Sequence, residues 1–213
     1  MTNFIPIFPL SIIVFPGETL NLHIFEPRYK QLIQECVEQK KPFGIPAVVN
    51  KELKDLGTLI EITAIKQVYE DGKMDISTRG IKVFRLLEVL KEVPDKLYSG
   101  AIVTYPEDED DGKQLLMQQV VKGIKELHKL LEVSKDFKKP EEELKAFDVA
   151  HHMGLNIEEE YELLGLFREA QRQEYLKRHL GKVIPMLTEM ESLKDKVKLN
   201  GHFRNLTSFD FDL

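Results

Sequence analysis

Residues 5–29 are IPIFPLSIIVFPGETLNLHIFEPRY, and the predicted fold is built outward from this stretch. Two short apolar runs flank Pro16-Gly17, a pair that favours a tight turn. Between residues 20 and 24 the apolar side chains fall at every second position, which is the period of a half-buried strand. Pro27 fits the first turn of a helix, where a backbone N–H has no intrahelical partner. The stretch therefore predicts a strand, a turn, a second strand and a helix.

The predicted helix has one apolar face. It carries Tyr29, Leu32, Ile33, Cys36 and Val37 at helical spacing. Cys36 is the single cysteine of the chain, so no internal disulfide forms, which fits a reducing compartment. Its place on the apolar face predicts a buried structural thiol rather than a nucleophile. Glu26 and Arg28 are expected to form a local ion pair where the strand meets the helix.

Several residues of this stretch occur in an order known from one family. They are Pro9-Leu10, Phe15-Pro16-Gly17, Leu22 and Phe25-Glu26-Pro27-Arg28-Tyr29. The order resembles the amino-terminal substrate-binding domain of Lon proteases, in particular the small proteins that consist of that domain alone. This resemblance implies a β-barrel related to the PUA fold and a module that binds polypeptide. It continues through Asp71-Gly72, Gly80 and Arg85, but Val83 stands where the family has the first arginine of a Gly-x-x-Arg-x-Arg pattern.

The following residues predict a sheet. Strands are expected over residues 42–49, 56–65 and 101–105, and a hairpin turn at Glu70-Asp71-Gly72-Lys73. The return strand begins at Met74 and is expected to break at Gly80 before residues 83–89 continue the sheet. Several short strands with one early helix favour a partly closed antiparallel barrel over alternating βαβ units.

An acidic run divides the chain. The predicted organisation is a barrel subdomain over residues 1–106, an acidic linker over 107–112, a helical bundle over 113–200 and an extended tail over 201–213. The run is expected to be solvated. Asp111 and Gln114 have the spacing of a capping box, which predicts that Asp111 caps the first helix of the bundle.

Three further helices are predicted in the bundle. One opens at Pro140-Glu141-Glu142, and another is capped by Asn156 and Glu159. The last is the longest and is expected to kink at Pro185 and to end at Asn200-Gly201. Its apolar seam comprises Leu176, Leu180, Val183, Leu187, Met190, Leu193 and Val197. The predicted class is α+β: an amino-terminal PUA-like antiparallel β-barrel with one early helix, followed by an α-helical bundle.

Charge excludes some classes of partner. The net charge of −6 arises wholly after residue 106, because the preceding residues carry equal numbers of cationic and acidic side chains. Phosphate contacts dominate nucleic-acid affinity, so a neutral sheet and an acidic bundle make nucleic-acid binding unexpected. No apolar run is long enough to span a bilayer, and prolines interrupt the apolar start of the chain, so the protein is predicted to be cytoplasmic.

The sequence predicts no catalytic motif. The sequence has no Gly-x-x-x-x-Gly-Lys-Ser/Thr phosphate loop, and none of its serines stands in a Gly-x-Ser-x-Gly context. Adjacent helical positions point apart, so His151-His152 is expected to be one exposed and one buried histidine rather than a metal site. No catalytic, cofactor-binding or metal-binding residue is therefore assigned, and the protein is predicted not to be an enzyme.

The function predicted from the sequence is a non-catalytic protein- or peptide-binding module, acting as an adaptor or as a chaperone-like binder of unfolded segments. Its expected partner is unfolded polypeptide or a partner protein. One alternative is an RNA-binding PUA-like module, which would require a basic face on the sheet. A weaker alternative is a hydrolase with a site assembled from scattered residues, which would require a cleft with convergent titratable groups.

The tail supplies the candidate contact residues. They are Phe203, Phe209, Phe211 and Leu213, the last three of which alternate with aspartates as in a strand with one apolar face. Two interpretations are open. The tail packs on its own domain as a last core element, or it occupies a peptide groove of its own or a neighbouring molecule, which would allow self-association through the tail.

Overall fold

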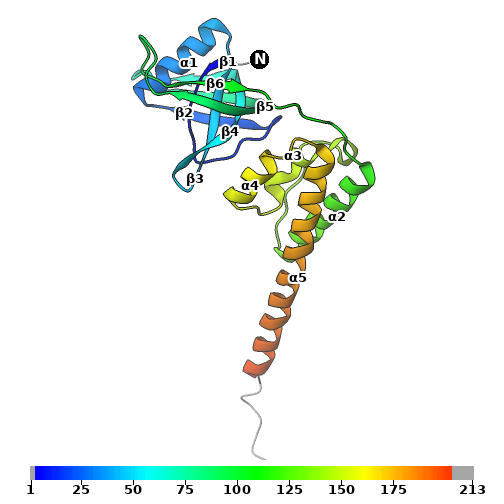
Figure 1. Ribbon diagram of the computed structural model, residues 1–213. Coiled ribbons are helices and arrows are strands. Elements are labelled where there is room, and N and C mark those ends of the chain that lie inside the picture. The colour runs from blue at the N-terminus through cyan, green and yellow to red at the C-terminus, as the bar shows by residue number, and fades with distance from the viewer. Residues whose placement is uncertain (1–2, 203–213) are drawn as a thin grey trace, which may run out of the picture.

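The computed structural model is a mixed α+β protein in which a strand-rich part precedes a helical part (Figure 1). It describes the fold of residues 3–202 and the side chains of residues 3–197. The strands are β1 (Asn3–Pro6), β2 (Thr19–Ile24), β3 (Phe43–Val49), β4 (Glu52–Val68), β5 (Met74–Leu90) and β6 (Gly100–Thr104). The helices are α1 (Pro27–Gln39), α2 (Gln114–Leu130), η1 (Glu141–Glu143), α3 (Ala146–Val149), η2 (Ala150–His152), α4 (Ile157–Leu164) and α5 (Glu169–His202). The predicted α+β class is confirmed, while the division into domains stays a prediction.

The strands form one antiparallel sheet in the order β1-β6-β5-β4-β3, and β2 pairs with β5. The strands at the two ends of this order are β1 and β3. The residues that follow β1 connect the two ends by contacting β3. Isolated parallel bridges join Ile7 to Gly44 and Leu10 to Ala47. The Phe8 N–H donates to the Gly44 carbonyl at 2.8 Å. These contacts curl the sheet without a continuous ladder, so the barrel is only partly closed, as predicted.

Gly80 does not break its strand, so that prediction was wrong. β5 runs without interruption from Met74 to Leu90. Its pairing with β4 is irregular only where β-bulges shift the register. A Cβ atom at Gly80 would lie 2.4 Å from the Phe15 carbonyl oxygen. Backbone hydrogen bonds of 2.9 Å join Gly80 to Gly17 and to Glu18. Glycine is needed here because the turn at Pro16-Gly17 packs directly on the strand.

Helix α1 confirms the predicted buried face except at Val37, which is exposed. Tyr29, Leu32, Ile33 and Cys36 are buried. Burial raises the pKa of the Cys36 thiol to about 12, so the group stays protonated and structural. The predicted corner ion pair is present, with Arg28 Nη2 2.7 Å from Glu26 Oε2.

The acidic run pairs with the helical part. Asp108 bonds Arg172, Glu109 and Asp111 pair with Arg168, and Asp110 pairs with Lys145. The prediction that Asp111 caps α2 was wrong: Asp111 Oδ1 accepts the Ala170 N–H at 2.9 Å and so caps α5. α2 instead starts after Lys113, whose N–H donates to the Gln173 side chain at 2.9 Å. Tertiary packing thus supplies the start of each helix with a hydrogen-bond partner that is distant in sequence.

The predicted helix after Pro140 is divided into η1, α3 and η2. Leu144 is extended, with ψ of 136°, and stops the first piece. The Ala146 N–H then donates to the Glu169 carboxylate at 2.7 Å and the Lys145 N–H to Asp148 at 3.0 Å, so side chains restart the helix. By contrast, the capping box of Asn156 and Glu159 forms on α4 as predicted.

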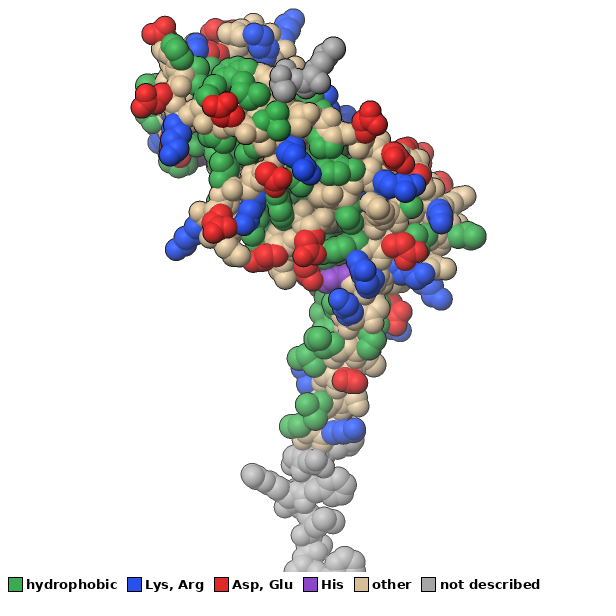
Figure 2. Space-filling model, viewed as in Figure 1, with side chains coloured by type: hydrophobic (Ala, Val, Ile, Leu, Met, Phe, Trp, Pro, Cys, Tyr) green, Lys and Arg blue, Asp and Glu red, His purple; other side chains and the backbone are tan. Residues whose placement is uncertain are grey.

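Helix α5 extends beyond the rest of the molecule (Figure 1, Figure 2). It passes through Pro185 without interruption and continues to His202, past the predicted stop at Asn200-Gly201. The kink at Pro185 stays a prediction. Val183, Ile184 and Leu187 are the last residues of α5 that pack on the core.

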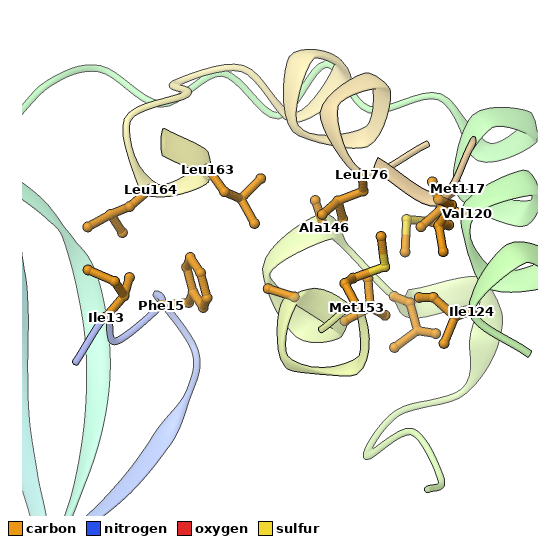
Figure 3. Close-up of a cluster of buried hydrophobic side chains, with 14 of the residues drawn as sticks. Ile13, Phe15, Met117, Val120, Ile124, Ala146, Met153, Leu163, Leu164 and Leu176 are labelled. Carbon is orange, nitrogen blue, oxygen red and sulfur yellow. The ribbon is translucent and has the colours of Figure 1, made fainter. Parts of the chain in front are cut away.

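One hydrophobic cluster joins the two parts of the chain. Its members include Ile13 and Phe15 from the segment between β1 and β2, and Leu163 and Leu164 from α4. Figure 3 shows Leu163 and Leu164 above Ile13 and Phe15, with residues of α2 and α5 farther along the same cluster. The Phe15 ring also stacks on Phe147, with centroids 5.1 Å apart. The helices therefore complete a core that begins in the sheet.

His151 forms a polar link between the same two parts. Its Nε2 lies 3.1 Å from Glu18 of the turn before β2, and its Nδ1 lies 2.9 Å from Glu160 of α4. Bonds to Glu160 and Glu18 raise the pKa of His151 to about 9. As predicted, His151 is partly exposed and its neighbour His152 is buried.

This link predicts a pH-dependent contribution to stability. Folding favours protonated His151, so its contribution is complete below the unfolded-state pKa of about 6.5. The contribution is lost as the pH rises from there through about 9, where the folded form deprotonates. In thermal melts, His151→Gln should therefore lower Tm most at pH 6 and least at pH 9.5. A Tm difference that stays constant across this range would contradict the assignment.

Candidate functional site

The tail residues predicted to contact a partner, Phe203, Phe209, Phe211 and Leu213, lie outside the described residues. Within the described part of the chain, no cluster of His, Cys, Asp and Glu side chains could hold a metal ion. In the same part, no helix is both long enough and apolar enough to cross a membrane. The remaining candidates are cavities and open backbone edges.

A cavity of about 630 Å³ lies between α2, residues 141–145 and the start of α5. Four of its charged groups form two ion pairs: Lys125 lies 2.6 Å from Glu141, and Lys145 lies 2.6 Å from Asp110. Buried Glu169 accepts hydrogen bonds from the Ala146 N–H and from Arg172. Because these polar groups already have partners, none of them indicates a ligand in the cavity.

Strand β4 has an edge that is only partly used. β3 pairs with this edge from Glu52 to Ile60 and goes no further. The opposite edge pairs with β5 as far as Val68. Residues 61–68 therefore pair on one side only within the described part of the chain. An edge of this kind presents backbone N–H and C=O groups to which another extended chain can bond.

A groove of about 430 Å³ lies beside this edge and the end of α1. Its lining residues are Cys36, Val37, Lys40, Lys41, Pro42, Glu61, Ile62, Thr63, Ala64, Ile65 and Ile81. α1 ends at Lys40 in the left-handed conformation, with φ of 51°, and the Lys41 N–H donates to the Cys36 carbonyl at 2.9 Å. This turn sends the chain directly into β3 and leaves the edge of β4 beyond Ile60 uncovered.

Three exposed aliphatic side chains line the groove: Val37, Ile65 and Ile81, with exposed fractions of 36%, 42% and 40%. Ile81 belongs to a β-bulge, since Leu59 pairs with Lys82 and Ile60 with Gly80. The extra residue of a bulge is unpaired and can redirect its side chain. The bulge thereby adds apolar surface from β5 to a groove formed mainly by α1 and β4.

The groove has charged residues but no reactive group. Lys40 and Lys41, which follow α1, and Glu61 of β4 are its charged residues, so cations outnumber carboxylates. Cys36 also lines it, but burial keeps this thiol protonated. The arrangement can bind an extended chain through its backbone, contact apolar side chains and favour an acidic residue near the lysines.

Sequence reasoning predicted the helix, β4 and the hairpin, but not this groove. The free edge exists because β3 starts at Phe43 opposite Ile60, a pairing that depends on the whole sheet. Ile65 and Ile81 were the available signal, since each is an apolar residue directly before a lysine in a strand segment. Nothing in their spacing distinguishes them from core residues.

Comparison with known proteins confirms the family that the sequence was predicted to resemble. Residues 5–182 match the family described as the ATP-dependent protease La (LON) substrate-binding domain. Val83, which stands where the family pattern has an arginine, packs against the core shared by the two parts of the chain. Val83 thus makes a hydrophobic contact at the position where the family pattern has an arginine.

Two relatives match parts of the chain. Lon protease of Parabacteroides distasonis is 32% identical over 133 residues, which cover 58% of this chain and 16% of that protein. Protein cereblon of Gallus gallus is 27% identical over 90 residues, which cover 40% of this chain and 20% of that protein. The chain therefore spans only a small fraction of the length of either relative.

Two solved structures have the same fold. The Lon N-terminal domain protein from Xanthomonas campestris has a TM-score of 0.62 and 23% identity, covering 82% of this chain and 96% of that structure. The N-terminal domain of Mycobacterium avium complex Lon protease has a TM-score of 0.60 and 13% identity, covering 84% and 99%. Because the family match extends over most of the chain and the fold agrees, the protein belongs to the Lon substrate-binding domain family.

Proposed function

We propose that this protein is a non-catalytic module that binds polypeptide substrates and holds an extended segment of them beside residues 61–68 of β4. The observation that carries the proposal is the unpaired edge of β4 facing a groove with three exposed aliphatic side chains. The family description, a substrate-binding domain, supports the same type of ligand.

Binding would proceed by strand addition. Alternate backbone groups of the substrate bond to the edge of β4, and every second substrate side chain enters the groove against Val37, Ile65 and Ile81. At about 3.3 Å per residue, the edge over residues 61–68 offers roughly 25 Å of pairing length. A segment of about eight residues fills it.

This mode selects unfolded segments. A folded protein has already paired its backbone N–H and C=O groups, so few can bond to an added edge. The module would therefore act as a chaperone-like binder or as an adaptor that presents unfolded chains to another protein. A cytoplasmic location is part of the proposal, supported by the single, buried Cys36.

A labelled peptide tests the proposal directly. The probe is a fluorescein-labelled peptide of about ten residues with alternating valine and threonine and two glutamates at one end. Fluorescence anisotropy should give saturable binding that weakens about tenfold or more with Ile81→Asp, because one aliphatic contact becomes a buried charge. The same peptide with alternate amides N-methylated should bind far more weakly, since it cannot form the ladder.

The matched control is Leu87→Asp. Leu87 is also aliphatic, 54% exposed and the extra residue of a bulge in β5, but it lies outside the groove. It should leave peptide affinity unchanged. Equal losses with Ile81→Asp and Leu87→Asp, or equal binding of the N-methylated peptide, would rule out strand addition at this groove.

A further inference from the structure

The strand beside the β4 groove indicates which end of a bound segment lies where. β3 is antiparallel to β4, and its first residue, Phe43, lies opposite Ile60. A segment added along residues 61–68 would use the same edge of β4 as β3 does, so it would lie in line with β3. If the segment is antiparallel to β4, as both neighbours of β4 are, it runs in the direction of β3. Its carboxyl end then points toward Phe43.

The chain itself closes this end of the groove. Residues 40–42 connect α1 to β3, directly before Phe43, and all three line the groove. The N–H groups of Lys40 and Lys41 donate to carbonyls in the last turn of α1, and Pro42 has no N–H. The connection therefore offers no free backbone N–H with which an added segment could continue its ladder. Pairing with β4 ends here.

The charges at this end are cationic. Lys40 and Lys41 are exposed, and neither ammonium group has a hydrogen-bond or ion-pair partner among the side chains that the structure describes. Glu61 is the one acidic residue that lines the groove. A free α-carboxylate is attracted by the two ammonium groups, whereas a free α-ammonium is repelled by them. Charge therefore favours the antiparallel direction, with the carboxyl end of the segment beside the lysines.

We propose that the groove selects the free carboxyl terminus of an extended polypeptide and binds its α-carboxylate with the ammonium groups of Lys40 and Lys41, an inference that rests on the proposed strand addition. The residues that precede the terminus pair with β4 over residues 61–68. Every second one of their side chains contacts the three aliphatic side chains of the groove. The substrate class is thus a carboxyl-terminal segment with apolar residues at alternate positions, rather than an internal segment.

Three peptides test the selection against the full chain. Each has about ten residues of alternating valine and threonine and an amino-terminal fluorescein. The first ends in a free carboxylate, the second in an amide, and the third in a glutamate whose own carboxyl is amidated. Fluorescence anisotropy should show that the free acid binds about tenfold more tightly than either amide, because a hydrogen bond to a charged group is stronger than one to a neutral group.

The conformation of Lys40 provides a variant that leaves the helix end intact. Lys40 is left-handed, with φ of 51° and ψ of 43°, a conformation that glycine adopts without strain. Lys40→Gly should therefore keep or raise Tm while it weakens binding of the free acid by several-fold. It should leave binding of the amide unchanged. Lys41→Gln should also weaken binding of the free acid alone.

The matched control is Lys51→Gly. Lys51 is also exposed and left-handed, with φ of 66°, but it lies in the turn between β3 and β4 and outside the groove. It should leave the affinities of all three peptides unchanged. Equal affinities of the free acid and the amide, or equal effects of Lys40→Gly and Lys51→Gly, would overturn carboxyl-terminal selection and leave strand addition standing.

Two other results separate the remaining cases. If the amidated glutamate peptide bound as tightly as the free acid, the lysines would recognise any carboxylate, and selection of a chain terminus would be wrong. If none of the three peptides bound, strand addition at β4 would fail, and the inference that rests on it would fail with it.

Discussion

Phe15→Ala should lower the free energy of unfolding by about 3–5 kcal/mol. Phe15 is completely buried and stacks on Phe147 of α3. The substitution would remove the ring from the cluster that joins the sheet to the helices and leave a cavity between them. The expected loss is a large fraction of the stability of a typical domain. Urea unfolding followed by far-ultraviolet circular dichroism measures it.

Phe25→Ala is the matched control for Phe15→Ala. Phe25 lies in the same amino-terminal stretch but is 56% exposed, so its removal should change stability by only about 0.5 kcal/mol. Similar losses for the two substitutions would show that the sheet and the helices do not depend on a shared core at Phe15.

Arg172→Met should cost about 3–5 kcal/mol of stability, because it removes one member of a buried ion pair. The guanidinium bonds Glu169 at 2.9 Å and Asp108 at 2.6 Å and lies over the Phe147 ring at 4.3 Å. Glu169 is 1% exposed, so the substitution would leave a carboxylate in the core without its cation. Thermal and urea unfolding of the purified variants measure the loss.

Two further variants separate the effect of charge from that of packing. Arg168→Met removes an exposed arginine that pairs with Glu109 and Asp111, and should cost less than about 1 kcal/mol. Adding Glu169→Gln to Arg172→Met removes the uncompensated charge while keeping an acceptor for Ala146, and should recover part of the loss. If Arg168→Met were as costly as Arg172→Met, burial would not be the cause.

The features predicted correctly from the sequence are local ones. Pro27 starts a helix because its ring fixes φ, and Asn156 caps α4 because Glu159 is three residues away. The alternation of Leu20, Leu22 and Ile24 indicates a strand, and that strand forms by pairing with a single neighbour, β5. Such features depend on residues within a few positions, so the sequence displays them completely.

The features that were missed depend on distant residues. Asp111 had the spacing to cap α2, yet its carboxylate accepts the Ala170 N–H at the start of α5. Gly80 resembled a strand break, yet it is required for contact with the turn at Phe15. The groove at β4 depends on where β3 stops.

The same limit applies to α5. Leu180 and Leu193 belong to one predicted seam, but Leu180 is 3% exposed and Leu193 is 61% exposed. Helical spacing identifies an apolar face without specifying whether the chain itself covers it. The two leucines differ because Leu180 lies within the helical bundle and Leu193 lies beyond its end.

The shared core also sets an order of events during synthesis. Ile13, Phe15 and Leu56 leave the ribosome long before Leu176 and Leu180, with which they form one cluster. At about 5–20 residues per second, the sheet then waits on the order of ten seconds for the helices that cover it. During that interval the nascent chain exposes an apolar face of its own, and it has the character of the unfolded segments that the finished protein is proposed to bind.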